Sequence, residues 1–369
     1  MAEKVRAATL LEGGRFEIRE YDMPELSEDD ALLKVEAAGI CGSDWGSYQK
    51  TVAGLDNRTP RIMGHENTGA VAGIGAAASA RWGVKEGDRI VLEQYLPCGV
   101  CNWCRMGEYR FCDDTDRMPG KDILRYGASP VRVRSLIGGF GEYLYVHPRS
   151  IIHKVPDHVT PSEAALLVPM ANGVQWAALH GELHPGKTVL IQGPGQMGLG
   201  CVVAAKRAGV DRIIVSGSLP RDAERFAMAK RLGADDVIDV QTESVRERVR
   251  EILGRRGVDT VVNVSGGAQG TVAEALDVVG KQGIIVLAGA GDQEVRLAGF
   301  GRKIVQIRVA HGSSFEAFTR ALETIGSGKF PLAEMITHQF PMTQAEDAIL
   351  ALGGKGPAGV IHVNVMPWA

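Results

Sequence analysis

Four cysteines gather in one short stretch of the chain. Cys98, Cys101, Cys104 and Cys112 follow the spacing C-x-x-C-x-x-C-x7-C, in a chain that has six cysteines in all. A tetrahedral zinc site takes four thiolates at about 2.3 Å, and short C-x-x-C spacings supply most of them from one loop. An iron–sulfur cluster also takes four cysteines, but this spacing in an otherwise cysteine-poor chain favours zinc. Such a site leaves no position for a substrate, so its predicted role is structural.

A second set of candidate ligands lies nearer the N-terminus. Cys41, Ser43 and Asp44 stand close together in one segment, and His65 and Glu66 are adjacent in another, directly after a glycine. Taken alone, a cysteine usually packs in a core and a histidine usually lies at the surface or caps a helix. Together the residues offer a thiolate, an imidazole and a carboxylate, with further polar groups to orient them. A catalytic zinc requires such a set.

A glycine-rich turn predicts a binding site for a dinucleotide. Thr188–Gln192 is an apolar run of the kind found in strands buried on both faces, and an Ala-rich helical pattern follows, ending at Gly209. Between them the pattern G-x-G-x-x-G holds Gly193, Gly195, Gln196, Met197 and Gly198. Its glycines permit the turn, the approach of a pyrophosphate and the packing of helix on strand. The phosphates would lie at the N-terminus of the helix.

The choice between NAD and NADP is decided at the end of the second strand of such a fold. NAD enzymes usually place an acidic residue there for the ribose 2′-hydroxyl. This chain has Gly217 and Ser218 instead, and its first acidic residue is Asp222. The two small residues leave room for a 2′-phosphate, and Arg221 can neutralise it. The sequence therefore favours NADP over NAD, although Arg221 also suits a solvated helix start.

These residues require two different kinds of supporting structure. From residue 5 to about 155 the chain has short strands interrupted by glycine, such as 31–37 and 87–93, which predicts a β-rich domain. Beyond Pro156 buried strands alternate with helices, which predicts an α/β fold with a doubly wound parallel sheet. The strands expected after 188–192 are 212–216, 236–239, 259–264, 283–288 and 304–309, with helices such as 220–232 and 244–253 between them. We predict one domain over 1–160 and 310–369 and a second over 161–309.

Composition excludes several classes of function. The net charge of −3 gives no basic surface for nucleic acid and no polybasic membrane patch. The first twelve residues lack the apolar core of a signal peptide, and no apolar run reaches the roughly 18 residues that a bilayer requires. We therefore expect a cytoplasmic protein, where cysteines serve metals more often than disulfides.

The motifs, taken in order and spacing, resemble the zinc-dependent medium-chain alcohol dehydrogenases, a family that includes sorbitol and threonine dehydrogenases. The resemblance rests on 39–44, 64–66, the four cysteines and 193–198, and also on 138–143, so that it covers nearly the whole chain. It implies a GroES-like catalytic domain, a Rossmann domain for the cofactor, and NAD(P)-dependent interconversion of an alcohol, expected to be secondary, and a ketone. It also implies a homodimer or homotetramer in which 283–288 extends a sheet across a two-fold axis.

The resemblance also implies roles for individual residues. Cys41 and His65 would be ligands of a catalytic zinc, Ser43 would relay the hydroxyl proton, and Asp44 would orient His65. Zinc as a Lewis acid would lower the pKa of the alcohol, and the nicotinamide would accept the hydride.

Three positions depart from the family pattern. The third zinc ligand falls at Val168, which cannot bind metal, and the histidine expected five residues after the ligand cysteine is Gly46. The cation that often faces the glutamate of the Gly-His-Glu motif is replaced by Gly359 in a loose alignment. Freed of that cation, Glu66 can become the third ligand, which requires a bend at Gly64 or a reaching side chain. Otherwise the site is weak or vacant.

Rival functions remain open at this point. They are a zinc-free quinone or enoyl reductase of the same superfamily, a non-catalytic binding protein on this fold, and a methyltransferase with a similar glycine turn. The last leaves the four cysteines without a purpose. Trp45, Tyr48 and Tyr95 are candidate substrate-wall residues, although loop aromatics are as often packed locally. An insertion over 113–135 could bind an anionic substrate, but its acidic residues favour a solvated face; its basic residues are Arg117, Lys121, Arg125, Arg132 and Arg134.

Overall fold

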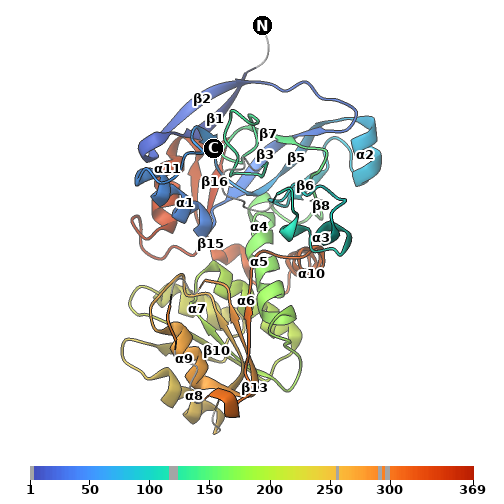
Figure 1. Ribbon diagram of the computed structural model, residues 1–369. Helices are drawn as coiled ribbons and strands as arrows, with labels where there is room; N and C mark the ends of the chain where they lie inside the picture. Colours follow the sequence, from blue (N-terminus) through green and yellow to red (C-terminus); the bar gives the residue numbers. More distant parts are fainter. Residues whose placement is uncertain (1–3, 116–123, 255–256, 290–292, 296–299) are drawn as a thin grey trace. The chain divides into compact units, whose positions relative to one another are not determined.

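The computed structural model describes residues 4–115, 124–254, 257–289, 293–295 and 300–369. The chain forms two compact units (Figure 1). The first comprises 1–168, 325–327 and 336–369, and the second comprises 169–324 and 328–335. The second unit thus continues beyond residue 310 through most of a helix, α10. Among the described residues, no helix is long and apolar enough to cross a membrane.

The first unit is built mainly of antiparallel strands. One sheet has the order β2-β1-β4, and a seven-stranded sheet has the order β15-β16-β3-β5-β6-β8, with β7 paired to β3. The strands are β1 (Lys4–Leu10), β2 (Phe16–Asp22), β3 (Ala31–Gly39), β4 (Arg61–Ile62), β5 (Glu66–Ile74), β6 (Arg89–Leu92), β7 (Tyr143–Val146), β8 (Ile152–Lys154), β15 (Ile336–Pro341) and β16 (His362–Met366). This is the β-rich domain that the sequence predicts.

Short helices connect these strands. They are α1 (Gly42–Val52), α2 (Ala76–Trp82), α3 (Asn102–Arg105), α4 (Pro161–Ala164) and α11 (Ala345–Leu352), with 3-10 turns at Glu12–Gly14, Tyr109–Phe111 and Met342–Gln344. Alternate residues of the strands point into one apolar core, in which Leu33, Val35, Leu92 and Phe140 are almost fully buried. The core supports β3 and β5, and the segments next to these strands hold the first candidate metal ligands.

The second unit contains the predicted parallel sheet. Its order is β11-β10-β9-β12-β13-β14, and every neighbouring pair is parallel. This order reverses direction between β9 and β12, as in a doubly wound dinucleotide fold, so the predicted fold class is confirmed. The strands are β9 (Thr188–Gln192), β10 (Arg212–Gly217), β11 (Asp236–Asp239), β12 (Val258–Asn263), β13 (Val279–Leu287) and β14 (Gln306–Val309).

Helices flank the parallel sheet (Figure 1). They are α5 (Leu167–Gly173), a π-helical stretch (Val174–Leu179), α6 (Gln196–Ala208), α7 (Ala223–Leu232), α8 (Val245–Leu253), α9 (Thr271–Val278) and α10 (Phe315–Gly326), with 3-10 turns at Phe300–Arg302 and Leu332–Met335. Val249 of α8 and Leu276 of α9 pack on Leu190 and Ile285 of the strands. Helices cover these strand residues, and strands covered in this way are typically apolar runs, as β9 is.

One prediction about the sheet edge is wrong. The sequence places 283–288 at the edge that would extend across a two-fold axis, but β13, which contains it, lies between β12 and β14. The edge strand on this side of the sheet is β14, whose residues Ile307 and Val309 are 44% and 79% exposed. The order of strands in a parallel sheet depends on how the crossovers pack, and a local apolar run does not reveal it.

Candidate active site

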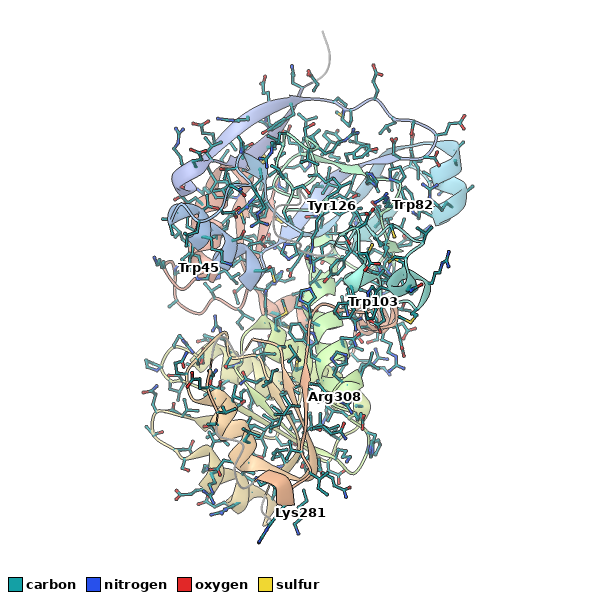
Figure 2. All side chains as sticks on the ribbon, in the orientation of Figure 1. Trp45, Trp82, Trp103, Tyr126, Lys281 and Arg308 are labelled. Carbon is teal, nitrogen blue, oxygen red and sulfur yellow. The ribbon has the colours of Figure 1, made fainter. Side chains whose placement is uncertain are left out.

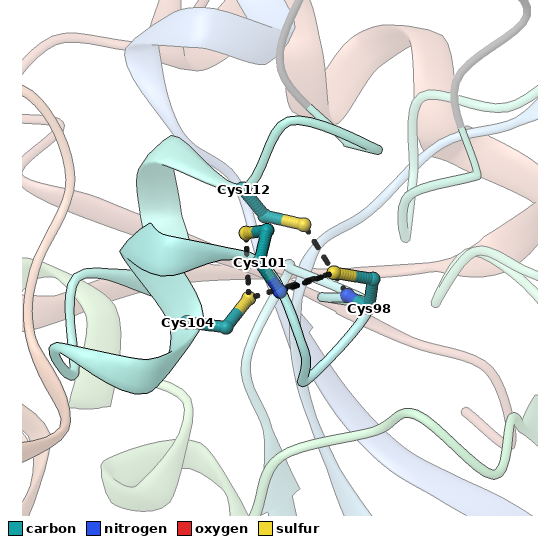
Figure 3. Close-up of side chains that lie close together, drawn as sticks. All are labelled: Cys98, Cys101, Cys104 and Cys112. Atoms are coloured by element: carbon teal, nitrogen blue, oxygen red, sulfur yellow. Dashed lines mark hydrogen bonds between the residues drawn. The ribbon is translucent and has the colours of Figure 1, made fainter.

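The four predicted cysteines come together in one cluster (Figure 3). Their sulfur atoms all lie within 4.8 Å of one another. The Sγ atoms of Cys101 and Cys104 are 3.5 Å apart, and those of Cys98 and Cys104 are 4.0 Å apart. Cys104 lies on α3 and Cys112 follows the 3-10 turn Tyr109–Phe111, so that a short helix and a turn direct the thiols to one point.

Backbone amides point at two of these sulfurs. The N–H of Cys98 donates to Cys112 Sγ at 3.2 Å, and the N–H of Cys101 donates to Cys98 Sγ at 3.3 Å. Burial opposes ionisation of Cys112, but the backbone amides of Cys98 and Asp114, together with the side chains of Thr115 and Cys98, outweigh burial and lower the pKa of this thiol to about 6. Thiolates are the form that binds metal, so this environment fits a zinc ion held by four sulfurs.

The second cluster brings together Cys41, His65 and Glu66. One ligand atom of each residue lies within 4.8 Å of the others. Cys41 is the residue before α1 and follows the end of β3 by two residues, and His65 directly precedes β5, in which Glu66 is the first residue. Because β3 and β5 are antiparallel neighbours, the end of one strand meets the start of the other. Residues that are far apart in sequence thereby face the same point.

Asp44 connects two members of this cluster. Its Oδ2 accepts a hydrogen bond from the N–H of Cys41 at 3.0 Å, and its Oδ1 lies 3.3 Å from Nδ1 of His65. A carboxylate at Nδ1 holds the proton there and leaves Nε2 with a free lone pair for a metal. Ser43 Oγ lies 3.5 Å from that Nε2 atom. The structure thus places both predicted accessory residues beside His65.

A bend before β5 allows adjacent residues to face one site. Gly64 has φ of +90°, and a Cβ there would lie 2.7 Å from the ring of Phe140. Only glycine adopts this conformation readily, so the chain turns at Gly64 and His65 stays outside the regular strand. Joint ligation by His65 and Glu66 requires either a bend at Gly64 or a reaching side chain, and the structure contains the bend. Val168, at the usual third-ligand position, is a buried apolar residue, 3% exposed.

Glu66 is the clearest indication that this cluster binds a cation. Its side chain is fully buried, and neither carboxylate oxygen has a hydrogen-bond partner among the described residues. Burial raises the pKa of this carboxyl group and Asp44 adds to the rise, whereas His65 and the neighbouring thiol of Cys41 act against it. An unpaired buried carboxylate is costly unless a cation completes it. The thiolate, imidazole and carboxylate therefore fit a zinc ion, and they leave one position open.

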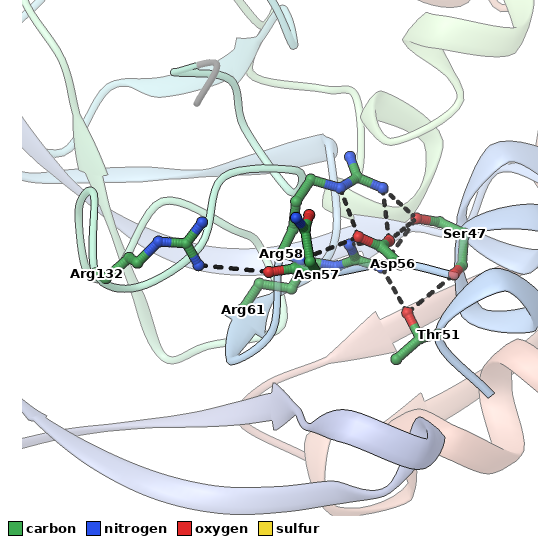
Figure 4. A network of polar contacts seen from close by, with 7 residues as sticks. All are labelled: Ser47, Thr51, Asp56, Asn57, Arg58, Arg61 and Arg132. Carbon is green, nitrogen blue, oxygen red and sulfur yellow. Dashed lines mark hydrogen bonds and ion pairs between the residues drawn. The ribbon is translucent and has the colours of Figure 1, made fainter. Parts of the chain in front are cut away.

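A buried polar network ties together the segments on both sides of this cluster (Figure 4). Arg61 of β4 is fully buried and bonds Asp56 Oδ2 at 2.6 Å, Ser47 Oγ at 2.9 Å and Thr51 Oγ1 at 3.3 Å. Arg58 bonds the same carboxylate at 2.6 and 2.8 Å. Ser47 and Thr51 belong to α1, whose N-terminus follows Cys41, whereas Arg61 lies four residues before His65. The network therefore fixes the two ligand-bearing segments relative to each other.

The glycine turn of the second unit has the geometry that a dinucleotide requires. Gly193 follows β9 directly and has φ of +103°. A Cβ on Gly198 would lie 1.9 Å from the carbonyl oxygen of Gly193, whereas nothing lies within 4 Å of a Cβ on Gly195. The last glycine thus allows close packing, and the middle one faces open space at the start of α6. The free N–H groups there suit a phosphate.

The residues predicted to distinguish NADP from NAD at the ribose 2′-position lie around Asp222. This carboxylate is fully buried and accepts bonds from the N–H of Ser218 at 2.9 Å and from Arg221 at 3.1 Å. Arg225 donates to it at 3.0 Å. The Arg221 side chain stays 73% exposed, and two guanidinium groups against one carboxylate leave a net positive charge. Sequence reasoning missed Arg225, although its spacing of four residues from Arg221 at a helix start was a usable signal.

The three candidate substrate-wall aromatics are packed inside the first unit. Trp45, labelled in Figure 2, stacks on Tyr48 with ring centroids 6.0 Å apart. Tyr48 donates a hydrogen bond to Glu346 of α11 at 2.8 Å. Tyr95 is 1% exposed, and the Arg125 guanidinium lies 4.4 Å from the centre of its ring. These contacts show local packing, and the substrate-wall role stays a prediction.

The basic residues of the insertion do not gather at one point. Arg117 and Lys121 lie outside the described residues. Arg134 lies 3.8 Å from the centre of the Tyr145 ring, and Arg132 donates to the carbonyl oxygen of Asn57. Together with the position of Arg125 on Tyr95, these contacts give the described basic residues separate structural partners.

Two buried histidines near the clusters were not expected from the sequence. His153 Nε2 lies 2.8 Å from Glu93 Oε1, and the hydroxyl of Tyr109 donates to the same carboxylate at 2.7 and 2.8 Å. His362 of β16 is fully buried, and burial lowers its pKa to about 4. Its Nε2 lies 2.9 Å from Asn364 Oδ1. The signal was present, since a histidine and an asparagine interrupt an otherwise apolar run at 360–365.

Comparisons with known proteins agree with this geometry. The model of the alcohol dehydrogenase GroES-like domain matches residues 27–157, and that of the zinc-binding dehydrogenase domain matches 197–327. A Mycobacterium tuberculosis protein named as an alcohol dehydrogenase is 36% identical over 95% of each chain. A sorbitol dehydrogenase of Bombyx mori is 30% identical over 97% of this chain and 98% of its own.

A solved structure extends the likeness to three dimensions. It is that of a zinc-binding dehydrogenase of Sinorhizobium meliloti 1021 bound to NADP, with a TM-score of 0.82 and 26% identity. The match covers 99% of this chain and 100% of that chain. The similarity therefore spans both units and every motif described above.

Proposed function

The chain belongs to the zinc-type medium-chain alcohol dehydrogenases, enzymes that oxidise alcohols with NAD(P), and we propose that it holds its catalytic zinc with Cys41, His65 and Glu66. The observation that carries this proposal is Glu66, a fully buried carboxylate without a hydrogen-bond partner among the described residues, beside a thiol and an imidazole. A cation at this point would bind the thiolate, the imidazole and the carboxylate together. Val168 makes a conventional third ligand impossible, so Glu66 replaces it.

The residues around the cluster orient its ligands and accept the proton of the substrate. Cys41, His65 and Glu66 would hold a zinc that supplies a Lewis acid for the alcohol oxygen, and the turn at 193–198 would hold a nicotinamide dinucleotide that supplies a hydride acceptor. Asp44 keeps the proton of His65 on Nδ1 and anchors the backbone of Cys41, which fixes two ligands at once. Ser43, with its hydroxyl 3.5 Å from His65, is placed to accept the proton of the substrate hydroxyl. With glycine at position 46, any onward transfer passes from Ser43 to solvent.

The four-cysteine cluster is proposed as a structural zinc site. All four sulfurs would bind the metal, which leaves no coordination position for a substrate. Backbone N–H groups directed at the sulfurs of Cys98 and Cys112 support the thiolate form. The metal would hold the loop 98–112 in place, since this loop contains only one turn of α-helix and a 3-10 turn.

For the cofactor we propose NADP rather than NAD. The absence of an acidic residue at Gly217 and the exposed guanidinium of Arg221 support this choice, and Arg225 adds a second positive charge. A 2′-phosphate would replace solvent around these groups. The solved relative from Sinorhizobium meliloti was crystallised with NADP, which agrees with the proposal.

We further propose that the enzyme is a cytoplasmic homo-oligomer. The six cysteines form no disulfide, and reduced thiols persist in a reducing compartment. The edge strand β14 presents Ile307 and Val309 to solvent, and an exposed apolar edge favours pairing with a second copy. Such pairing would continue the parallel sheet from one subunit into the next. A homodimer is the smallest assembly that covers this edge.

Metal analysis combined with alcohol oxidation tests the catalytic site. The purified protein should hold two zinc ions per chain, and mild chelation should remove one, abolish oxidation of secondary alcohols and leave the fold intact. Glu66→Gln should reproduce the chelated state, because an amide is a poor zinc ligand, whereas Val168→Glu added to it should restore binding. Glu142→Gln, which alters a carboxylate paired with Arg6, is the matched control. Full activity after loss of the second zinc would refute the proposal.

A further inference from the structure

The carboxylate of Glu66 occupies a space that exists because residue 39 has no side chain. Gly39 ends β3 and lies directly opposite Glu66 on β5 and Asn364 on β16. A Cβ atom on Gly39 would lie 2.6 Å from Glu66 Oε2 and 3.1 Å from Glu66 Cβ. Glycine weakens a strand interior, and it is found where another group approaches the backbone closely. Here the approaching group is the candidate zinc ligand.

His362 closes the same space from the other side. Its Cε1 atom would lie 3.0 Å from the Cβ of residue 39, and its ring is fully buried. Nε2 of His362 is held by Asn364 Oδ1 at 2.9 Å, so the ring is fixed by the strand that follows it. No Lys or Arg side chain of the described residues bonds to Glu66. The carboxylate and the fixed His362 ring therefore both border the place where residue 39 has no Cβ, and no Lys or Arg of the described residues neutralises the carboxylate.

We propose that Gly39 and His362 are positioning residues that hold the Glu66 carboxylate within reach of the zinc bound by Cys41 and His65. Gly39 provides the space and His362 limits how far the side chain can move within it. The inference rests on the proposed ligation by Glu66. Metal–ligand distances in a zinc site deviate from their usual values by only about 0.2 Å. The residues that pack against a ligand side chain therefore affect the affinity for zinc.

Replacing Gly39 by alanine tests the space directly. The atom closest to the new Cβ is Glu66 Oε2, the far end of a flexible side chain, whereas His362 Cε1 and Glu66 Cβ need to shift by only a few tenths of an ångström. Gly39→Ala should therefore fold and displace the carboxylate. We expect the affinity for the chelatable zinc to fall at least about tenfold in a chelator competition, a change of about 1.4 kcal/mol. The spectrum of Co²⁺ bound at that site should change as well. The four-cysteine zinc should remain.

Matched variants separate this effect from general damage. Gly46→Ala makes the same substitution on α1, where nothing lies within 4 Å of the new Cβ, and should leave zinc affinity unchanged. In a Glu66→Asp background, whose shorter side chain vacates the space, Gly39→Ala should cost much less than tenfold. If Gly39→Ala fails to fold, recovery of a folded Gly39→Ala/Glu66→Asp protein supports the proposal, and its failure to fold refutes it.

The same variants distinguish failure of the positioning role from failure of Glu66 as a zinc ligand. If Glu66→Gln leaves the affinity for the chelatable zinc unchanged, Glu66 is not a ligand and the proposed site falls. If Glu66→Gln weakens zinc but Gly39→Ala does not, or if Gly39→Ala costs the same in both backgrounds, Glu66 is a ligand and the positioning role is refuted. For His362, substitution by Lys should weaken zinc by pairing with Glu66, whereas an unchanged affinity would remove His362 from the proposal.

Discussion

Arg61→Met should destabilise the first unit by about 3 kcal/mol, because it removes the centre of the network in Figure 4. Breaking a buried ion pair costs about 3–5 kcal/mol when one charge is left behind. Here Asp56 keeps Arg58, and Nε of Arg61 has no partner even in the native state, so the lower end applies. Methionine retains the apolar stem, which separates loss of charge from loss of packing.

Urea unfolding followed by tryptophan fluorescence would measure this change. Four of the five tryptophans lie in the first unit, so the signal reports mainly on it. Zinc must be held at a fixed excess, since a bound metal adds to the free energy of unfolding. The midpoint of thermal unfolding should fall by about 6–12 °C for a unit of this size. Zinc affinity at the Cys41 cluster should fall too, because the network joins α1 to β4.

Arg58→Met is the control for this prediction. The Arg58 side chain is 32% exposed, and its removal leaves Asp56 paired with the buried Arg61. A partly exposed pair contributes up to about 1 kcal/mol, so Arg58→Met should be at least twofold milder. Equal losses for the two variants would show that burial of Arg61 does not set its contribution. An unchanged stability of Arg61→Met would refute the reasoning altogether.

The remaining predictions concern the other sites. Cys104→Ser should lose the metal that resists chelation and lower the free energy of unfolding, as metal analysis and urea unfolding would show; retention of both zinc and stability would contradict the site. Arg221→Ala should weaken NADPH about tenfold, roughly 1.4 kcal/mol, and leave NADH nearly unchanged in fluorescence titrations, whereas equal losses would contradict an NADP preference. Val309→Lys should shift the oligomer towards monomer in sedimentation at micromolar concentration, and Val240→Lys next to the opposite edge strand should not; a wild type that is only monomeric would exclude the assembly. Although burial opposes it, Arg58 and Arg61 hold the pKa of Asp56 well below its usual range. The folded state therefore gains stability above the ordinary carboxyl pKa of about 4 and loses it as the pH falls towards the folded pKa, so Asp56→Asn should flatten the loss of stability below about pH 4.

Features that depend on only a few neighbouring residues could be predicted from the sequence. The helices α7 and α8 end at Leu232 and Leu253, as their following glycines predict, because helix caps involve only adjacent residues. The turn at 193–198 and the cysteine spacing at 98–112 are local in the same way. Family membership followed from these motifs, and the comparisons confirm it.

Features that depend on strand order were not readable. The sequence predicts the edge of the parallel sheet at 283–288, but the crossover after β13 adds β14 outside it. The anchoring of Tyr48 by Glu346, 298 residues further along the chain, likewise appears only when distant segments meet. Each of these contacts depends on packing between elements, and the sequence pattern of one element does not specify its neighbour.

By itself the sequence predicted the candidate ligands of zinc and the candidate turn for a dinucleotide, because donor type and short spacing are properties of the chain. It also raised Glu66 as the replacement for a ligand that Val168 cannot supply. The tertiary structure decided what surrounds Glu66: the order β16-β3-β5 places Gly39 and His362 beside its carboxylate. A buried charge is controlled by the groups that enclose it, and here those groups come from three strands that only the folded sheet brings together.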